Sequence, residues 1–271
     1  MNLKEIKNLD ELEILISEYS ANDSLTNNYI LVDDLRQFIE KKEIFSWGKD
    51  SNFFIFIQKQ GFYRLYYIVN NVNVQYDFSK INIVIEIVYR GEARIPLDHI
   101  KYWEKSNFRS HLTRDCYFLD AASIQTDHNQ IEGVTIQPPK TEKDIFAAKR
   151  LIDENLDLYT GDRLSLHEIK KFIARGLFFC AYKDNLMCGM LQADLKNNIY
   201  WLGHIVVHED YRGMGLASLL IDTYLGEGLK LLVRGFQLWV IHDNIPAINL
   251  YKKKGFAYLN KSTHSMLKDN K

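Results

Sequence analysis

Residues 207–217 read Val-His-Glu-Asp-Tyr-Arg-Gly-Met-Gly-Leu-Ala. They follow a run of strand-like composition, 199–207, and lead into a helix-like run that begins at Leu216. Glycines let backbone N–H groups approach an anion closely, and the first turn of a helix adds N–H donors that have no partner within the helix. A diphosphate fits such a turn, although an ordinary strand-turn-helix connection has the same composition. The spacing matches neither the Rossmann nor the Walker A glycine pattern.

A second segment, residues 244–256, reads Asn-Ile-Pro-Ala-Ile-Asn-Leu-Tyr-Lys-Lys-Lys-Gly-Phe and follows the strand-like run 238–241. Asn244 is a suitable N-cap, and Pro246 is tolerated in the first turn of a helix. Gly255 ends the pattern after three lysines that suit the negative end of a helix. The local sequence therefore predicts a helix over 244–254.

Together the two segments resemble the GNAT acyltransferase superfamily, whose members bind acetyl-CoA or another acyl-CoA. The family's Arg/Gln-x-x-Gly-x-Gly/Ala signature corresponds to Arg212, Gly215 and Ala217. Its Asn-x-x-Ala-x-x-x-Tyr-x-x-x-Gly-Phe pattern corresponds to residues 244–256 without a gap. The resemblance covers about residues 134–267 and implies an α/β (α+β) fold with a mixed sheet.

Length and composition are compatible with this class of protein. The chain has 271 residues, 46% hydrophobic and 13% aromatic, enough for one large or two ordinary domains. It has no apolar run of about 18 residues, and its first residues lack a signal-peptide core. The three cysteines are widely spaced, and the net charge of -1 argues against a nucleic-acid partner. We therefore expect a cytoplasmic protein with no metal, membrane or nucleic-acid partner; its oligomeric state stays open.

The second half of the chain is expected to be a mixed α/β domain in the GNAT order of elements. Helices are expected at 143–156, 165–175, 216–233 and 244–254, and strands at 134–137, 177–182, 187–195, 199–207, 236–241 and 257–267. Ser165 and Glu168 have the spacing of a capping box. Gly226 and Gly228, inside the third helix, should each cost about 1 kcal/mol relative to alanine.

The first half repeats this order. Helices are expected at 3–19, 32–41 and 96–112, and strands at 53–58, 62–69 and 81–89. We therefore predict a tandem of two GNAT-like domains, a diverged one over 1–130 and a GNAT N-acetyltransferase domain over 131–271, joined at the polar stretch 126–132. Segment 88–95 is expected where the phosphate turn would be. It lacks the second glycine, and Pro96 interrupts the helix start, so no CoA is expected to bind there.

The resemblance implies roles for the residues around the first segment. In the family an amine attacks the thioester directly, so orientation and a neutral amine matter more than a nucleophile. The residues that correspond to the diphosphate turn are Arg212, Gly213, Met214, Gly215, Leu216 and Ala217. The backbone that would hold the pantetheine arm and the thioester carbonyl belongs to Ile205, Val206 and Val207.

The resemblance also implies residues for proton transfer and for further contacts. Tyr251 corresponds to the family's general acid, which protonates the departing thiolate; packing in the core is the alternative. His204 lies in the strand before the turn and is a candidate for the base, because histidine titrates near neutral pH; a structural role is its alternative. Asn244 and Asn249 would contact the CoA, although an N-cap and a solvated helix face explain them as well.

Four polar residues are candidates for the lining of the amine pocket, with a solvent-facing strand or loop as the alternative: Gln192, Asp194, His242 and Asp243. The chain is expected to transfer acetyl from acetyl-CoA, as co-substrate, to a primary amine of a small molecule or peptide. Another acyl-CoA, an alcohol acceptor and a CoA-binding sensor without catalysis are the alternatives.

Overall fold

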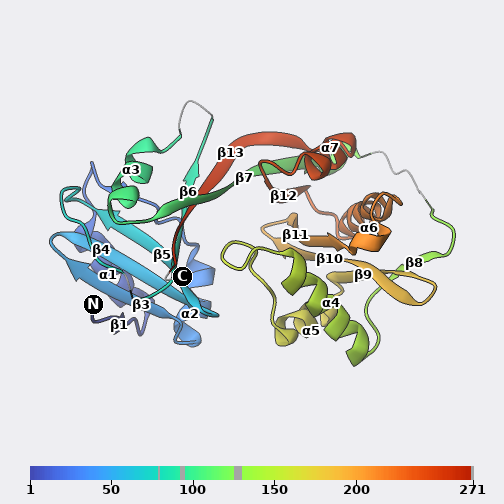
Figure 1. Ribbon diagram of the computed structural model, residues 1–271, viewed down its shortest axis with the longest axis horizontal. Coiled ribbons are helices and arrows are strands. Elements are labelled where there is room, and N and C mark those ends of the chain that lie inside the picture. The colour runs from blue at the N-terminus through green and yellow to red at the C-terminus, as the bar shows by residue number, and fades with distance from the viewer. Residues whose placement is uncertain (79, 92–94, 125–129, 270–271) are drawn as a thin grey trace. The chain divides into compact units, whose positions relative to one another are not determined.

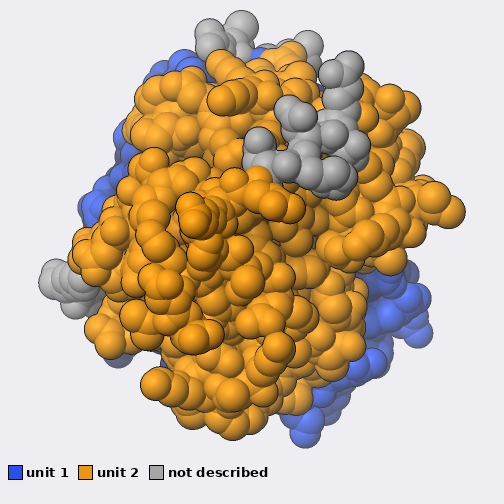
Figure 2. All heavy atoms as spheres, turned by 90° about the vertical axis from the view of Figure 1, so that its right-hand side faces the viewer, with its two compact units in different colours: residues 1–114, 261–271 blue, residues 115–260 orange. Residues whose placement is uncertain are grey.

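The computed structural model describes residues 1–78, 80–91, 95–124 and 130–269, which form two compact units. Unit 1 comprises Met1–Arg114 and Lys261–Lys271, and unit 2 comprises Asp115–Asn260; Figure 2 colours them separately. The chain passes from one unit to the other within strands β7 (Arg109–Asp120) and β13 (Ala257–Lys268). The assignment of 1–130 and 131–271 as functional domains stays a prediction. Within the described residues no helix combines the length and apolarity needed to cross a membrane.

Unit 2 is built on one mixed sheet. Its strands are β8 (Val134–Gln137), β9 (Phe178–Lys183), β10 (Leu186–Lys196), β11 (Ile199–Val207) and β12 (Gly235–Ile241). Their order is β7-β12-β11-β10-β9-β8, with β8 to β11 antiparallel and β11 parallel to β12. The parallel pair needs a long crossover, and helix α6 (Leu216–Lys230) supplies it.

Helices cover both faces of this sheet, as Figure 1 shows. Helices α4 (Glu142–Asn155) and α5 (Leu166–Ala174) pack on one face. Helices α6 and α7 (Ile245–Lys253) pack on the other. The predicted capping box is confirmed, because the Ser165 hydroxyl accepts from the Glu168 N–H and the Glu168 carboxylate accepts from the Ser165 N–H.

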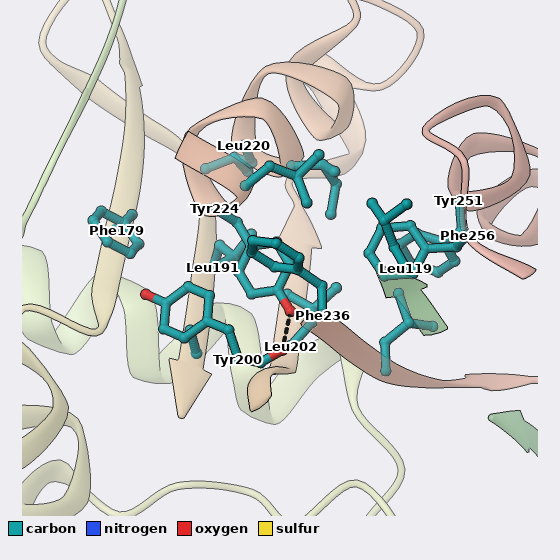
Figure 3. Close-up of a cluster of buried hydrophobic side chains, with 14 of the residues drawn as sticks. Leu119, Phe179, Leu191, Tyr200, Leu202, Leu220, Tyr224, Phe236, Tyr251 and Phe256 are labelled. Atoms are coloured by element: carbon teal, nitrogen blue, oxygen red, sulfur yellow. Dashed lines mark hydrogen bonds between the residues drawn. The ribbon is translucent and has the colours of Figure 1, made fainter. Parts of the chain in front are cut away.

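Packing explains one of the two glycines in α6. A Cβ on Gly228 would lie 2.2 Å from the Phe236 ring and 2.9 Å from the Tyr200 ring. Figure 3 shows these rings beside Tyr224, whose hydroxyl donates to the Tyr200 carbonyl at 2.6 Å. The helix therefore approaches the sheet more closely than a side chain would allow. A Cβ on Gly226 would meet no atom of the described residues within 4 Å, and nothing in the described structure explains this glycine.

Unit 1 has the same plan. Its strands are β1 (Lys4–Glu5), β2 (Leu25–Thr26), β3 (Ile44–Lys49), β4 (Asn52–Lys59), β5 (Phe62–Val69) and β6 (Ile83–Tyr89), with the order β1-β3-β4-β5-β6-β13 and β2 beside β5. Helices α1 (Leu9–Tyr19) and α2 (Val32–Glu40) pack on one face, and α3 (Leu97–Lys105) packs on the other.

The structure of unit 1 differs from the prediction in several places. The first helix begins at Leu9 rather than residue 3, because the Asn8 side chain caps it. Strand β3 was not predicted. The helix predicted over 96–112 ends at Lys105, and strand β7 begins at Arg109. The left-handed φ of 62° at Asn107 stops that helix, and the Phe108 N–H bonds back to the Trp103 carbonyl.

The sheet order also corrects the alignment of the two halves. Strand β5 is parallel to β6, as β11 is parallel to β12, so β6 corresponds to β12 and α3 corresponds to α7. The phosphate turn and α6 therefore correspond to residues 70–82, not to segment 88–95 as predicted. Apart from Ser79, which is outside the described residues, 70–82 contains no helix.

The two halves have exchanged strands near the ends of their sheets. The second part of β7 lies beside β12 in unit 2, where the Ala121 N–H donates to the Arg234 carbonyl at 3.1 Å. The last part of β13 pairs with β6 in unit 1, from Ser262–Tyr89 to Lys268–Ile83. Each unit therefore needs chain from the other half of the sequence to complete its sheet.

Candidate active site

The connection between β11 and α6 is a short 3₁₀ turn, Glu209–Tyr211, followed by Arg212, Gly213, Met214 and Gly215. Gly213 and Gly215 have φ values of 80° and 83°, in the left-handed region that residues with a Cβ rarely adopt. Among the described residues, a Cβ on Gly213 would meet no atom within 4 Å, and one on Gly215 would meet the Ile131 side chain alone, at 3.5 Å. The glycines are thus required by backbone conformation, and they leave the surface of the turn open.

The turn presents the start of α6 without a capping side chain. Gly215 is the N-cap residue, and the Leu219 N–H makes the bond to its carbonyl at 3.1 Å. The N–H groups of Leu216, Ala217 and Ser218 precede that bond and have no carbonyl partner within the helix. Together with the helix dipole, these donors make the turn suitable for a diphosphate.

Arg212 braces the turn against the strand before it. Its Nε donates to the Val207 carbonyl at 3.3 Å, and its Nη2 donates to the Asn155 side chain at 3.1 Å. The residue is exposed, as is Met214. Arg212 therefore holds the end of β11 and the end of α4 in place, while its charge stays near the α6 N-terminus.

Strands β11 and β12 part next to this turn. Their parallel pairing runs from Ile199–Gly235 to Leu202–Leu238, yet β11 continues to Val207 and β12 to Ile241. A bulge at Gly203 marks the change, because Gln192 pairs with His204 and Ala193 with Leu202. Among the described residues the two strands thus stop pairing after Leu202, and the unpaired stretch between them is called the opening here.

The ladder with β10 determines which backbone groups face this opening. The His208 N–H donates to the Cys188 carbonyl at 2.9 Å, and hydrogen-bonded pairs alternate along an antiparallel ladder. Val206 therefore directs its N–H and C=O toward β10. Ile205 and Val207 direct theirs away from β10, toward the opening, and the bond from Arg212 to the Val207 carbonyl agrees with this. Of the three residues predicted to hold the arm, Ile205 and Val207 have backbone groups that are not used by the β10 ladder, whereas those of Val206 are used by it.

Tyr251 lies in α7 within the core cluster of unit 2, with only 4% of its surface exposed. Figure 3 shows it beside Phe256, at a ring separation of 5.9 Å, and near Leu119. Burial raises the pKa of its hydroxyl, so the group stays protonated across the physiological range. A tyrosine in this state is a proton donor and not a base.

His204 lies half-buried on the side of the sheet that α4 and α5 cover. Its Nε2 is 3.2 Å from the Asp162 carbonyl oxygen, which can only accept, so Nε2 carries a proton. A neutral His204 then has its lone pair on Nδ1, and any proton that it accepts goes there. The loop between α4 and α5 thereby sets the tautomer of the candidate base.

The other predicted site residues are placed as follows. Asn244 is exposed and caps α7 by accepting from the Ala247 N–H at 3.2 Å, and Asn249 is on the exposed face of the same helix. Gln192 is 3% exposed and packs over Gly203. Asp194 pairs with Arg175 at 3.0 Å.

His242 and Asp243 are exposed at the end of β12. The Nδ1 of His242 lies 2.8 Å from the carboxylate of Asp115, a buried β7 residue that sequence reasoning missed. Nothing in the local sequence of β7 signals this pairing, because it depends on the strand exchange. Across the described residues, His, Cys, Asp and Glu side chains nowhere gather in a group of three that could hold a metal ion.

Part of the second half is similar to known proteins. Residues 148–256 match the sequence profile of the acetyltransferase (GNAT) family. The streptothricin acetyltransferase of Escherichia coli is 33% identical over 78 residues, which are 28% of this chain and 45% of that protein. The chain thus covers less than half of that relative. The match therefore supports a GNAT domain over residues 148–256.

Solved structures show the same fold over most of the chain. A GCN5-related N-acetyltransferase from Sphaerobacter thermophilus has a TM-score of 0.60 at 13% identity, covering 81% of this chain and 77% of that one. A tandem GNAT protein from the clavulanic acid biosynthesis pathway has a TM-score of 0.59 at 14% identity, covering 84% and 83%. The predicted fold class, a GNAT fold with a mixed sheet, is confirmed.

Proposed function

We propose that the protein is an acyl-CoA-dependent N-acyltransferase that transfers acetyl from acetyl-CoA to a primary amine, with its active site in unit 2. The observation that carries the proposal is the combination of two features at one place in the fold. The glycine turn opens onto the bare N-terminus of α6, and the adjoining strands part after Leu202. The turn suits a diphosphate, and the opening suits the narrow pantetheine arm.

The residues of unit 2 fit an acyl-CoA as follows. The N–H groups of Leu216, Ala217 and Ser218 would bind the diphosphate, beside Arg212, Gly213 and Met214. The backbone of Ile205 and Val207 would bind the amides of the arm and orient the thioester carbonyl. Asn244 and Asn249 extend from α7 as further contacts in this proposal.

The bound acyl-CoA supplies a thioester, whose carbonyl carbon accepts the amine nitrogen as the C–S bond breaks. The chain supplies orientation and two proton movements. Tyr251, protonated because burial raises its pKa, donates a proton to the leaving sulfur. His204 accepts the proton that the amine loses, at Nδ1, because Nε2 faces the Asp162 carbonyl. The products are an amide and a free thiol.

The acceptor is proposed to be a small molecule or peptide, and the cytoplasm to be the location. The test is release of CoA thiol from acetyl-CoA in the presence of a panel of primary amines, with matched alcohols and propionyl-CoA as further arms. An amine-dependent thiol signal, with a mass increase of one acetyl group on the amine, is the expected result. Acetyl-CoA binding without thiol release from any amine or alcohol would contradict catalysis and leave a CoA-binding sensor.

A further inference from the structure

Unit 1 repeats the parted strands of unit 2. The parallel pairing of β5 with β6 runs from Tyr63–Ile83 to Leu65–Ile85, and both strands then continue, to Val69 and Tyr89. Helix α3 follows β6 as α7 follows β12. The Phe108 N–H bonds to the Trp103 carbonyl at 3.0 Å, as the Phe256 N–H bonds to the Tyr251 carbonyl at 3.0 Å. Trp103 therefore takes the position of Tyr251, without a hydroxyl.

In unit 1 this opening is filled by the chain itself. Residues 25–29, between α1 and α2, run along the free side of β5: Leu25 pairs with Val69 and Thr26 with Ile68. The Asn27 side chain then spans the opening. Its Nδ2 donates to the Leu65 carbonyl at 3.1 Å and to the Glu86 carbonyl at 3.0 Å, and its Oδ1 accepts from the Tyr67 N–H at 2.8 Å.

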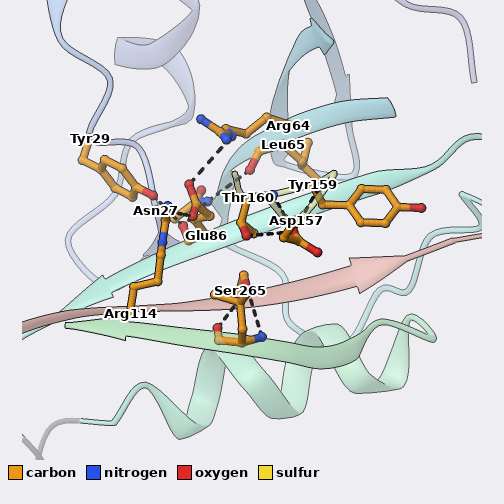
Figure 4. A network of polar contacts seen from close by, with 11 residues as sticks. Asn27, Tyr29, Arg64, Leu65, Glu86, Arg114, Asp157, Tyr159, Thr160 and Ser265 are labelled. Atoms are coloured by element: carbon orange, nitrogen blue, oxygen red, sulfur yellow. Dashed lines mark hydrogen bonds and ion pairs between the residues drawn. The ribbon is translucent and has the colours of Figure 1, made fainter. Parts of the chain in front are cut away.

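Asn27 is 4% exposed, and Figure 4 shows it directly beside Glu86 and Leu65. Its contacts begin just past the last β5–β6 pair, Leu65–Ile85, where the backbone groups of the two strands no longer bond to each other. Buried backbone groups need partners, and a primary amide supplies both donors and an acceptor. The Tyr29 hydroxyl adds a further bond to the Glu86 carbonyl at 3.0 Å.

We infer that residues 25–29 are a built-in plug, in which the Asn27 amide takes the place that unit 2 keeps open for the amides of a pantetheine arm. The inference rests on the proposed function for the meaning of the opening in unit 2. Unit 1 is thereby closed to acyl-CoA at its centre. A hollow of about 480 Å³ is left next to the plug, bordered by Thr26, Val88 and His99. The plug keeps unit 1 as a folded partner domain that does not compete for acyl-CoA.

The test is the hydrogen-exchange rate of the Tyr67 amide, whose proton is bonded to Asn27. In the wild type this amide should exchange slowly, at the same rate with and without saturating acetyl-CoA. Asn27→Ala should speed the exchange by roughly 10-fold or more. Asn28→Ala, the matched control at the next residue, should leave it unchanged, since its side chain makes no hydrogen bond within the described residues.

A change in Tyr67 exchange when acetyl-CoA is added to the wild type would overturn the inference, because it would show that the opening of unit 1 admits the ligand. An unchanged rate in Asn27→Ala would overturn it as well. If Asn27→Ala fails to fold, the Tyr67 exchange rate of the wild type with and without acetyl-CoA still tests whether the opening of unit 1 is closed to the ligand. Hydrogen exchange of the Ile205 and Ala217 amides, measured with and without acetyl-CoA, reports on ligand binding in unit 2. A failure of the proposed function would therefore appear at these amides and not at Tyr67.

Discussion

The substitution Gly215→Val examines the diphosphate turn. Gly215 has a φ of 83°, and a β-branched residue in this conformation costs about 1–2 kcal/mol or more. Because a Cβ there would meet Ile131 at an ordinary contact distance, 3.5 Å, and no other atom of the described residues, the protein should still fold. A valine side chain at the N-cap would, however, obstruct the N–H groups of Leu216 and Ala217. Two hydrogen bonds to a charged group contribute about 1.5–3 kcal/mol each, so the Kd for acetyl-CoA should rise roughly 10²–10⁴-fold.

Titration calorimetry of the folded variant measures this change. Gly176→Val is the matched control, because Gly176 also has a positive φ, 70°, and among the described residues no atom lies within 4 Å of an added Cβ. It lies after α5 and outside the turn. The control should share the conformational strain and keep wild-type affinity. Equal affinity in Gly215→Val and the wild type, or an equal loss in the control, would refute the reasoning.

Three further perturbations follow from the structure. Tyr251→Phe should keep acetyl-CoA affinity and lower turnover by roughly 10²–10⁴-fold, whereas the control Tyr182→Phe should keep both. Because burial raises the pKa of Tyr251, turnover of the wild type should show no loss from ionisation of this hydroxyl below pH ~10. Burial lowers the pKa of His264, whose Nδ1 lies 3.1 Å from the Thr113 hydroxyl. The contribution of neutral His264 to the free energy of unfolding should therefore be fully present above pH ~6.5 and be lost as the pH falls from there through the lowered pKa. Thermal melts of His264→Gln should show a weaker dependence of stability on pH in this range, and an unchanged dependence would assign it to other groups. The fragment 134–271 lacks the buried β7 residues Tyr117 and Leu119, so it should lose its cooperative melt and its acetyl-CoA affinity; a fragment that binds like the full chain would show that β7 is dispensable.

Much of unit 2 could be predicted from its sequence because its signals are local. The strand over 199–207, the glycine turn and the Asn244 cap each depend on neighbouring residues, and the structure has all three. The register of β11 could not be predicted from the sequence. The bulge at Gly203, which turns the Ile205 backbone toward the opening, depends on pairing with β10 and leaves no mark in the local composition.

Unit 1 was harder to predict because its decisive contacts are long-range. Residues 105–112 suit a helix as well as a strand, and the exchange of β7 and β13 between units determines the outcome. The plug at Asn27 reads as part of an ordinary polar loop in the sequence. Its role depends on backbone groups of β5 and β6 that only the folded sheet brings to it.

A crystal structure of the protein grown with acetyl-CoA would show whether the glycine turn and the opening between β11 and β12 bind the ligand. We predict one acyl-CoA per chain, with diphosphate oxygens within about 3 Å of the Leu216 and Ala217 N–H groups and the pantetheine arm between β11 and β12. The sulfur should lie within reach of the Tyr251 hydroxyl. An acyl-CoA bound between β5 and β6, or bound in unit 2 away from the turn, would contradict it.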